Sequence, residues 1–543
     1  MRTVRKSPFP ASRRGSALFV VLVVLVLLTL ATYTFTSTMI AERQASEMYG
    51  REVQSRLLAE SGVEYAAALL ENPDELTEQN YYHDPALFGN MTLISGNSQR
   101  NTGQFSLVSP MEQAEAAVAF RYGMTDESSK LNINEISKFG LDAELERELL
   151  MYIPNMDEFL ADAILDWIDT DEEPREFGAE NEVYEALDPP YSAENGACQS
   201  LDELLKVDGI TYALLYGEDA NRNGILDPNE NDGEAQLPID NADGILDLGF
   251  SAYLTVHSKE SNLRADGSEK IDINQSLLTE LYDQIIDAGL SEEVAQFIVA
   301  YRMNGASNIE ILDGQTGATT GDDQTDSALQ QIAQSIAKNA FSSNAEDSAV
   351  TRGGMDLSKG GSIEFLSLYD LVDAEVSATI DGAPATLESP WTTGNLTETF
   401  PDLYDTFATS SSGSIRGRIN INYCRSEVLM GLPNMTPEIA TAISGAQLIG
   451  ADGEPLPDEI ARRSTTAWML TDGLVSQTTI RLLDPFITAK GSVYRVQSIG
   501  HYGEGGPAVR LEAIIDATSA PARVISLRDL SGLGTAFPVI NQQ

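Results

Sequence analysis

The longest apolar run of the chain lies near its N-terminus, where residues Ser16 to Ala41 carry no charged side chain. A helix rises about 1.5 Å per residue, so this run is long enough to cross the ~30 Å hydrocarbon core of a bilayer. Basic residues and no acidic ones precede it, at positions 2, 5, 6, 13 and 14. This asymmetry predicts a cytoplasmic N-terminus and an extracytoplasmic remainder. A cleaved signal peptide is the alternative, but its apolar region is usually about 7–15 residues long.

An amphipathic pattern continues the apolar run without a break. From Glu42 onwards, apolar side chains recur every fourth residue, at Ala45, Tyr49, Val53 and Leu57. We expect the helix to end near Asn72-Pro73, because proline has no amide hydrogen and clashes with the preceding turn. The pattern therefore predicts a single helical rod over residues 16–72.

Strand-like runs lie at both ends of the remaining chain. Two of them, 105–108 and 116–122, follow the rod, and two more, 493–500 and 508–516, form a hairpin near the C-terminus. We expect these strands to form one sheet that is interrupted by a large insertion. The last residues of the chain read as a loosely ordered tail.

The inserted segment contains an internal repeat. Each copy opens on a similar tetrapeptide: Leu131-Asn-Ile-Asn134, Ile271-Asp-Ile-Asn274 and Ile419-Asn-Ile-Asn422. A helical pair follows each opening, and its second helix starts at residues typical of helix caps, within 153–157, 288–292 and 432–436. The pattern resembles helix-hairpin-helix or SAM-like modules.

The chain is strongly acidic, with 83 Asp and Glu residues against 34 Lys and Arg residues. Such a surface repels nucleic acid and attracts divalent cations, which argues against DNA binding by the helical modules. The three histidines, His83, His257 and His501, lie in unrelated contexts without a catalytic motif, so we expect no enzyme activity. Cys198 and Cys424 fit no metal or redox spacing, and they either pair or remain buried thiols.

A calcium-binding pattern of the EF-hand type spans residues 219–230. Its oxygen donors, the carbonyl of Ile225 among them, fall at the expected positions: Asp219, Asn221, Asn223, Ile225, Asp227 and Glu230. A degenerate copy follows with Asn241, Asp243 and Asp247, but Ile239 and Phe250 replace its first and last ligands. The sequence predicts structural Ca²⁺ here, and the alternative is a solvated loop rich in Asp, Asn and Gly.

The N-terminus resembles the type IV pilin and pseudopilin family, in which a basic leader ending in Gly precedes an uncharged helix. The resemblance implies cleavage by a prepilin peptidase between Gly15 and Ser16. The family usually has Glu at the fifth mature position, which is Val20 here. A missing Glu is a feature of the minor pseudopilin K family of type II secretion.

The segment 131–210 carries the strongest resemblance to pseudopilin K. The family pattern DWxDxD, then PRxxGAE and Tyr, is met by residues 166–184, and Tyr191, Asn195 and the helix at 200–210 follow in order. The resemblance implies further calcium ligands in this acidic stretch, namely Asp166, Asp169, Asp171 and Glu180. It also implies a protein anchored in the inner membrane with its large domain in the periplasm.

The expected fold class is therefore α+β, with a long transmembrane and amphipathic helix, a pilin-like antiparallel sheet and a large inserted helical region. The predicted parts are a leader (1–15), the helix (16–72), the first sheet segment (73–125), helical modules 1 (126–260), 2 (261–400) and 3 (401–475), the closing strands (476–518) and a tail (519–543).

The resemblance implies a tip subunit of the secretion pseudopilus, which primes fibre assembly and protein export across the outer membrane. Its implied partners are I-like and J-like minor pseudopilins and the major pseudopilin. One alternative is a membrane-anchored, calcium-stabilised adhesion protein. Another is a helix-hairpin-helix DNA-binding protein of a DNA-uptake pilus.

Overall fold

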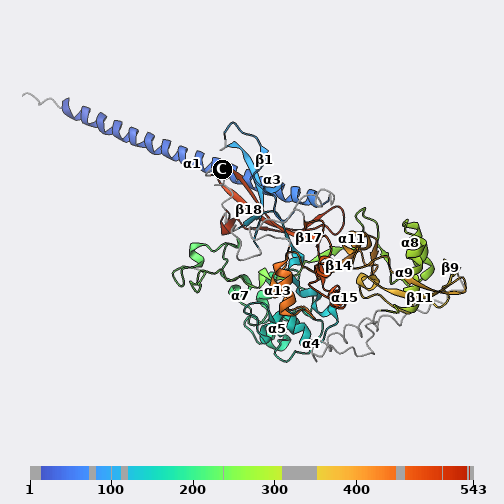
Figure 1. The fold of residues 1–543 in the computed structure, drawn as a ribbon. Coiled ribbons are helices and arrows are strands. Elements are labelled where there is room, and N and C mark those ends of the chain that lie inside the picture. Colours follow the sequence, from blue (N-terminus) through green and yellow to red (C-terminus); the bar gives the residue numbers. More distant parts are fainter. Residues whose placement is uncertain are drawn as a thin grey trace, which may run out of the picture.

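A long N-terminal helix, α1 (Arg14–Leu70), dominates the shape of the molecule. The computed structural model describes residues 14–71, 81–98, 101–111, 120–236, 238–308, 351–447, 459–503, 506–534 and 537. The first half of α1 is exposed and projects away from the other elements (Figure 1). By length and composition this helix is able to cross a membrane, with a mean hydropathy of 2.7 in its most apolar window. The predicted continuous rod is confirmed.

One antiparallel sheet of seven strands packs against the C-terminal half of α1 (Figure 1). Its order is β1-β2-β17-β18-β19, and β3 and β4 pair with β2 and β17. The strands are β1 (Met91–Ile94), β2 (Gly103–Pro110), β3 (Phe120–Tyr122), β4 (Thr125–Asp126), β17 (Val493–Tyr502), β18 (Ala508–Asp516) and β19 (Arg523–Asp529). Gln497 lies opposite Val108, so the two ends of the chain pair directly, as the fold class predicted.

The prediction of a loosely ordered tail is wrong for Arg523–Asp529. These residues form β19, because they hydrogen-bond to the open edge of β18. An ion pair of 2.6 Å from Asp529 to Arg56 also ties this strand to α1. The strand expected at 116–122 is present at Phe120–Tyr122, and residues 112–119 lie outside the described residues, as do residues 1–13 of the expected leader.

Glycines allow α1 to approach β17 closely. A Cβ atom on Gly62 would lie 2.2 Å from the Ser498 Oγ and 2.9 Å from the Phe105 ring. On the opposite side of the contact, a Cβ on Gly500 would lie 2.0 Å from the Ser55 carbonyl oxygen. Gly62 weakens the helix locally, but its missing side chain is what the packing against the sheet requires.

We expect Gly62→Ala to destabilise the protein by about 1–3 kcal/mol, because overpacking at this contact outweighs the ~1 kcal/mol gain in helix propensity. Gly50→Ala is the matched control, since no atom lies within 4 Å of its added Cβ. Denaturant unfolding of the full chain in detergent measures both variants. Equal stabilities of the two variants would contradict the close contact.

Three modules make up the insertion, and each is closed by a short parallel strand pair. The pairs are β5 (Leu131–Asn132) with β6 (Leu254–Thr255), β8 (Ile271–Asp272) with β13 (Phe407–Ala408), and β15 (Ile419–Asn420) with β16 (Ile487–Thr488). The second and third closing strands lie beyond the module ends expected at 400 and 475. These boundaries differ because the pairing joins segments that are far apart in sequence.

The last residue of each repeated tetrapeptide forms hydrogen bonds to distant segments of its module. The Asn134 amide donates to the Cys198 carbonyl, Asn274 donates to the carbonyls of Phe365 and Thr409, and Asn422 to those of Arg463 and Ala489. The repeated Asn therefore has the same structural role in each module.

The second helix of each pair is capped by a predicted residue. Asp157, Ser291 and Thr436 accept hydrogen bonds from the amides of Leu160, Val294 and Ile439. The pairs are α4 (Ala143–Met151) with α5 (Glu158–Ile168), α8 (Leu278–Asp287) with α9 (Glu292–Asn304), and α12 (Ser426–Met430) with α13 (Pro437–Gly445). The other α-helices of the described residues are α3 (Pro85–Phe88), α6 (Asn181–Glu185), α7 (Tyr212–Tyr216), α11 (Leu396–Thr406), α14 (Trp468–Thr471) and α15 (Gln477–Leu483). The hairpin β11 (Glu375–Ile380) and β12 (Ala383–Glu388) covers part of the second module, and short strands β7 (Lys259–Ser261) with β14 (Ser414–Arg416) and β9 (Thr351–Arg352) with β10 (Met355–Asp356) form further pairs.

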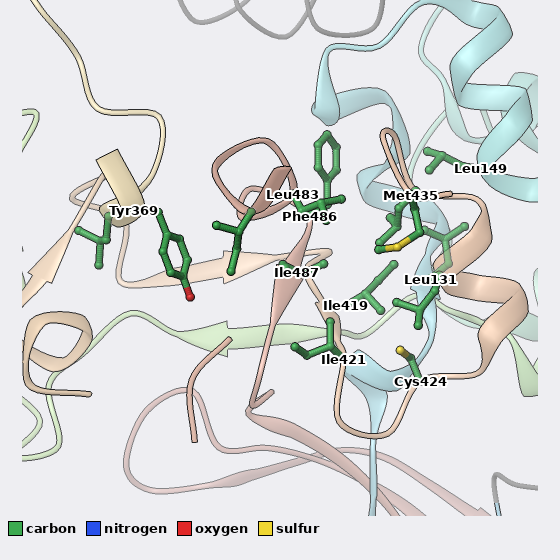
Figure 2. Close-up of a cluster of buried hydrophobic side chains, with 14 of the residues drawn as sticks. Leu131, Leu149, Tyr369, Ile419, Ile421, Cys424, Met435, Leu483, Phe486 and Ile487 are labelled. Atoms are coloured by element: carbon green, nitrogen blue, oxygen red, sulfur yellow. The ribbon is translucent and has the colours of Figure 1, made fainter. Parts of the chain in front are cut away.

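The modules share one hydrophobic core. Figure 2 shows Leu131 and Leu149 of the first module close to Ile419 and Met435 of the third, and all four are buried. Tyr369 of the second module belongs to the same cluster. The three modules therefore pack around one common core and not as separate domains.

A buried ion-pair network joins the modules beside this core. The guanidinium of Arg418 lies 3.3 Å from a Glu260 carboxylate oxygen and 3.2 Å from one of Asp484. It also donates to the Tyr404 hydroxyl and to the backbone carbonyl of Asp484. Although burial lowers the pKa of Arg418, the charges of Glu260 and Asp484 raise it overall, so the guanidinium stays charged.

Candidate metal centre

The acidic stretch after α5 folds back over the end of that helix. Asp162 and Asp166 lie on α5 and are fully buried. Asp162 forms a bidentate ion pair with Arg147, with both N–O distances 2.7 Å. Asp166 accepts hydrogen bonds from the Arg175 amide and lies 3.4 Å from its guanidinium. These two carboxylates anchor the returning segment.

Three other carboxylates meet at the turn. Oxygens of Asp169, Asp171 and Glu180, one from each, all lie within 4.8 Å of one another. Glu180 is buried, and neither of its carboxylate oxygens has a hydrogen-bond partner within the described part of the chain. The same holds for Oδ1 of Asp169. Such buried, unpartnered oxygens are costly unless they hold a cation.

The electrostatics agree with a cation site. Burial and the neighbouring charge of Asp171 raise the pKa of Asp169 to about 6. Burial and the charges of Asp166, Asp169 and Asp171 raise the pKa of Glu180 to about 7. Because all donors are oxygens, the site fits a hard divalent cation such as Ca²⁺ or Mg²⁺.

Nearby residues of the family pattern hold this turn in place. The Asn195 amide donates to the Asp171 carbonyl at 2.7 Å. A Cβ on Gly178 would lie 1.8 Å from Oδ2 of Asp166, so only glycine fits there. Of the four expected ligands, the structure groups Asp169, Asp171 and Glu180. Arg175 engages the Asp166 carboxylate, and its guanidinium also lies 3.9 Å from Oδ2 of Asp169.

The loop at residues 219–230 has the local conformation that the EF-hand pattern predicted. Gly224 has a φ of +70°, and its amide and that of Asn223 donate to the Asp219 carboxylate. Glu230, at the last position, is buried and accepts hydrogen bonds from the amides of Ala220 and Asp227. Burial raises the pKa of both carboxylates.

The remaining polar side chains of this loop point at one another. The amide groups of Asn221 and Asn223 both donate to Oδ2 of Asp227, at 2.6 and 3.0 Å. Oδ1 of Asn221 is buried and accepts no hydrogen bond from the described residues. The loop thus brings the side chains of Asn221, Asn223 and Asp227 together, and it leaves one buried amide oxygen without a partner among the described residues.

The degenerate copy uses residues that the sequence pattern did not reveal. Asn241 donates to Asp247, and Asp243 accepts from the Ile245 amide, as in the first loop. Glu218 accepts hydrogen bonds from the Asn241 and Asp247 amides and so bridges this loop as Glu230 bridges the first. Sequence spacing does not reveal Glu218, because it lies 23 residues before Asn241 and directly precedes the first loop.

Both cysteines are buried and free. Burial raises the pKa of Cys198 to about 12 and also raises that of Cys424. Of the two alternatives left by the sequence, the structure shows unpaired thiols that are protonated at neutral pH.

Comparisons with known proteins point to one family. Residues 129–216 match the family model for "Type II secretion system (T2SS), protein K", and this segment contains Asp169, Asp171 and Glu180. The type II secretion system protein K of Klebsiella pneumoniae is 28% identical over 213 residues, and that of Pectobacterium carotovorum subsp. carotovorum is 28% identical over 216 residues. Each match covers 37% of this chain and 60% of the relative. These matches confirm the resemblance that the sequence indicated.

A solved structure is also similar over most of the chain. It is the crystal structure of the GspK-GspI-GspJ complex from the type 2 secretion system of enterotoxigenic Escherichia coli. The TM-score is 0.35 at 10% sequence identity, and the match covers 90% of this chain and 99% of that one.

Proposed function

Because residues 129–216 match the family model for protein K of type II secretion, we propose that the whole chain is a minor pseudopilin of a type II secretion apparatus. In this role it lies at the tip of the pseudopilus, primes fibre assembly and supports protein export across the outer membrane. The family match carries the proposal, and α1 supports it, because an apolar helix that continues into a sheet-packed half suits a subunit anchored in the inner membrane before assembly. Its role is that of a structural subunit and not of an enzyme.

The tip position follows from the size of the domain above the membrane helix. A domain of ~470 residues has a radius of gyration near ~23 Å. Packed helices lie about 8–10 Å apart, so such domains would collide if every subunit of the fibre carried one. Val20, at the fifth position after Gly15, also offers no carboxylate to a neighbouring N-terminal amine. We propose that I-like and J-like minor pseudopilins and then the major pseudopilin follow below it.

Deletion of the gene in its own organism tests the proposal. Secreted proteins are expected to accumulate in the periplasm, and the full-length chain is expected to restore their export. The control is a chain with Leu25→Lys, which places a charge in the apolar run at a cost of about 2.5–3.5 kcal/mol and should fail to restore export. Unchanged export after deletion would refute the proposal.

Two observations separate this function from a calcium-stabilised adhesion protein. Mass spectrometry of the mature protein is expected to show cleavage by a prepilin peptidase and a start at Ser16, whereas a start at Thr32 would indicate an ordinary signal peptide. Immunogold labelling of the fibres is expected to mark one end, and uniform labelling would exclude a tip subunit.

We also propose that calcium stabilises the insertion. Asp169, Asp171 and Glu180 would hold one ion, and the loop at 219–230 a second. The support is the buried, unpartnered oxygens of Glu180 and Asn221. When bound, the cation would neutralise the repulsion between these carboxylates.

A further inference from the structure

A cavity of about 530 Å³ lies between the sheet and the first module. Ser498 contacts α1, whereas the adjacent Gln497 donates a hydrogen bond to the Arg222 carbonyl of the first module. Successive strand residues face opposite sides of a sheet, so the cavity lies on the side away from α1. A volume of this size is typical of sites for small ligands.

The lining of this cavity has the opposite charge balance to the chain. Five cationic side chains face three carboxylates, although the chain as a whole has 34 basic and 83 acidic residues. The cations are Lys130, Arg222, Arg425, Arg495 and Arg528. Among the carboxylates, Glu512 pairs with Arg495, Asp202 pairs with Arg528, and Asp219 accepts backbone amides of its own loop.

Two guanidinium groups are therefore left over. Neither Arg222 nor Arg425 forms an ion pair with any residue that the structure describes. Arg222 stacks on the Tyr216 ring at 4.0 Å, and Arg425 lies 5.5 Å from the Tyr253 ring centroid. Nε of Arg222 is buried and has no hydrogen-bond partner among the described residues. Stacking on an aromatic face fixes the plane of a guanidinium and leaves its N–H edge free for a planar carboxylate.

Apolar side chains complete the lining. Ile225 and Leu248 come from the first module, and Ile514 and Ile525 from β18 and β19. We propose that this cavity binds a small organic anion, in which an apolar body carries a carboxylate that the free guanidinium groups of Arg222 and Arg425 recognise.

Calorimetric titration of the full chain in dodecyl maltoside with 4-phenylbutyrate tests the proposal, with 4-phenylbutanamide as the neutral analogue of matched shape. We expect the carboxylate to bind at least about tenfold more tightly than the amide, because a charge-assisted bidentate pair is lost in the latter. Equal affinities for the two compounds, or no heat above the detergent blank at millimolar ligand, would overturn the proposal.

Three variants locate the site. Arg222→Gln and Arg425→Gln are each expected to weaken binding of the carboxylate about tenfold and to leave binding of the amide unchanged. Arg352→Gln is the matched control, since Arg352 forms an exposed ion pair with Asp283 in the second module. Ile525→Asp, at a side chain that is 44% exposed, keeps the fold and should abolish carboxylate binding by repulsion. An equal loss in the Arg352 variant, or unchanged affinity in the other three, would also overturn the proposal.

Discussion

Replacing Arg418 by alanine is expected to lower the free energy of unfolding by about 3–5 kcal/mol, because it leaves the buried Glu260 and the largely buried Asp484 carboxylates without their cation. Glu260 lies on β7, after the first module, and Asp484 follows α15 in the third. Their side chains are only 7% and 13% exposed, so little water replaces the lost guanidinium. Each comes from a different segment of the insertion, so their repulsion would loosen the packing between modules. Denaturant unfolding of the full chain in detergent measures the loss.

Arg352 provides a matched control for the replacement of Arg418. Arg352→Ala removes an exposed ion pair with Asp283, for which we expect about 0–1 kcal/mol. The double replacement Arg418→Met with Glu260→Gln should recover part of the loss, since it removes a buried charge on both sides. If Arg418→Ala destabilised the protein no more than Arg352→Ala does, the buried network would not hold the modules together.

Calcium is expected to raise the melting temperature of the full chain by several degrees relative to chelator. An ion that binds only the folded state contributes RT ln(1 + [L]/Kd), or about 2.7 kcal/mol at a hundredfold excess over Kd. Glu180→Gln together with Glu230→Gln should abolish most of this shift. In chelator, Glu180→Gln should be as stable as the wild type or more so, because it removes a buried carboxylate that repels its neighbours.

Glu180→Gln is thus expected to reduce stability in calcium but not in chelator, and this difference distinguishes a cation ligand from a purely structural residue. A side chain that merely packs would destabilise the protein in calcium and in chelator alike. Glu182→Gln is the control, since Glu182 lies two residues away and is exposed. If the melting temperature were the same in calcium and in chelator, the proposal that calcium stabilises the protein would be refuted.

The same centre predicts a dependence on pH. The pKa of about 6 for Asp169 and about 7 for Glu180 in the ion-free protein lies above the ordinary value of each group. Their contribution to stability without calcium is therefore fully present below the unfolded-state pKa of about 4 and is lost as the pH rises through 6 to 7. Protons and calcium compete for the same oxygens, so the calcium-induced rise in melting temperature should be larger at pH 8 than at pH 5.5. Equal shifts at the two pH values would contradict this competition.

Features set by neighbouring residues were predictable from the sequence. The continuous helix α1 follows from an uncharged run joined to a fourfold-spaced apolar stripe, and it ends at Leu70, just before Asn72-Pro73. Asp157, Ser291 and Thr436 cap helices where they were expected to do so, because capping depends on amides two or three positions away. The turn at Gly224 follows from the spacing of its own loop.

Tertiary structure decided the features that join distant segments. No local pattern reveals that β19 adds to β18, that Phe407–Ala408 close the second module, or that Glu218 accepts hydrogen bonds from the degenerate loop at Asn241 and Asp247. The engagement of Asp166 by Arg175, which lies outside the group of Asp169, Asp171 and Glu180, also depends on how the chain folds back over α5. Hydrophobic periodicity and capping act through adjacent residues and are therefore written in the sequence, whereas strand partners, ion pairs and cavities depend on which surfaces the completed core brings together.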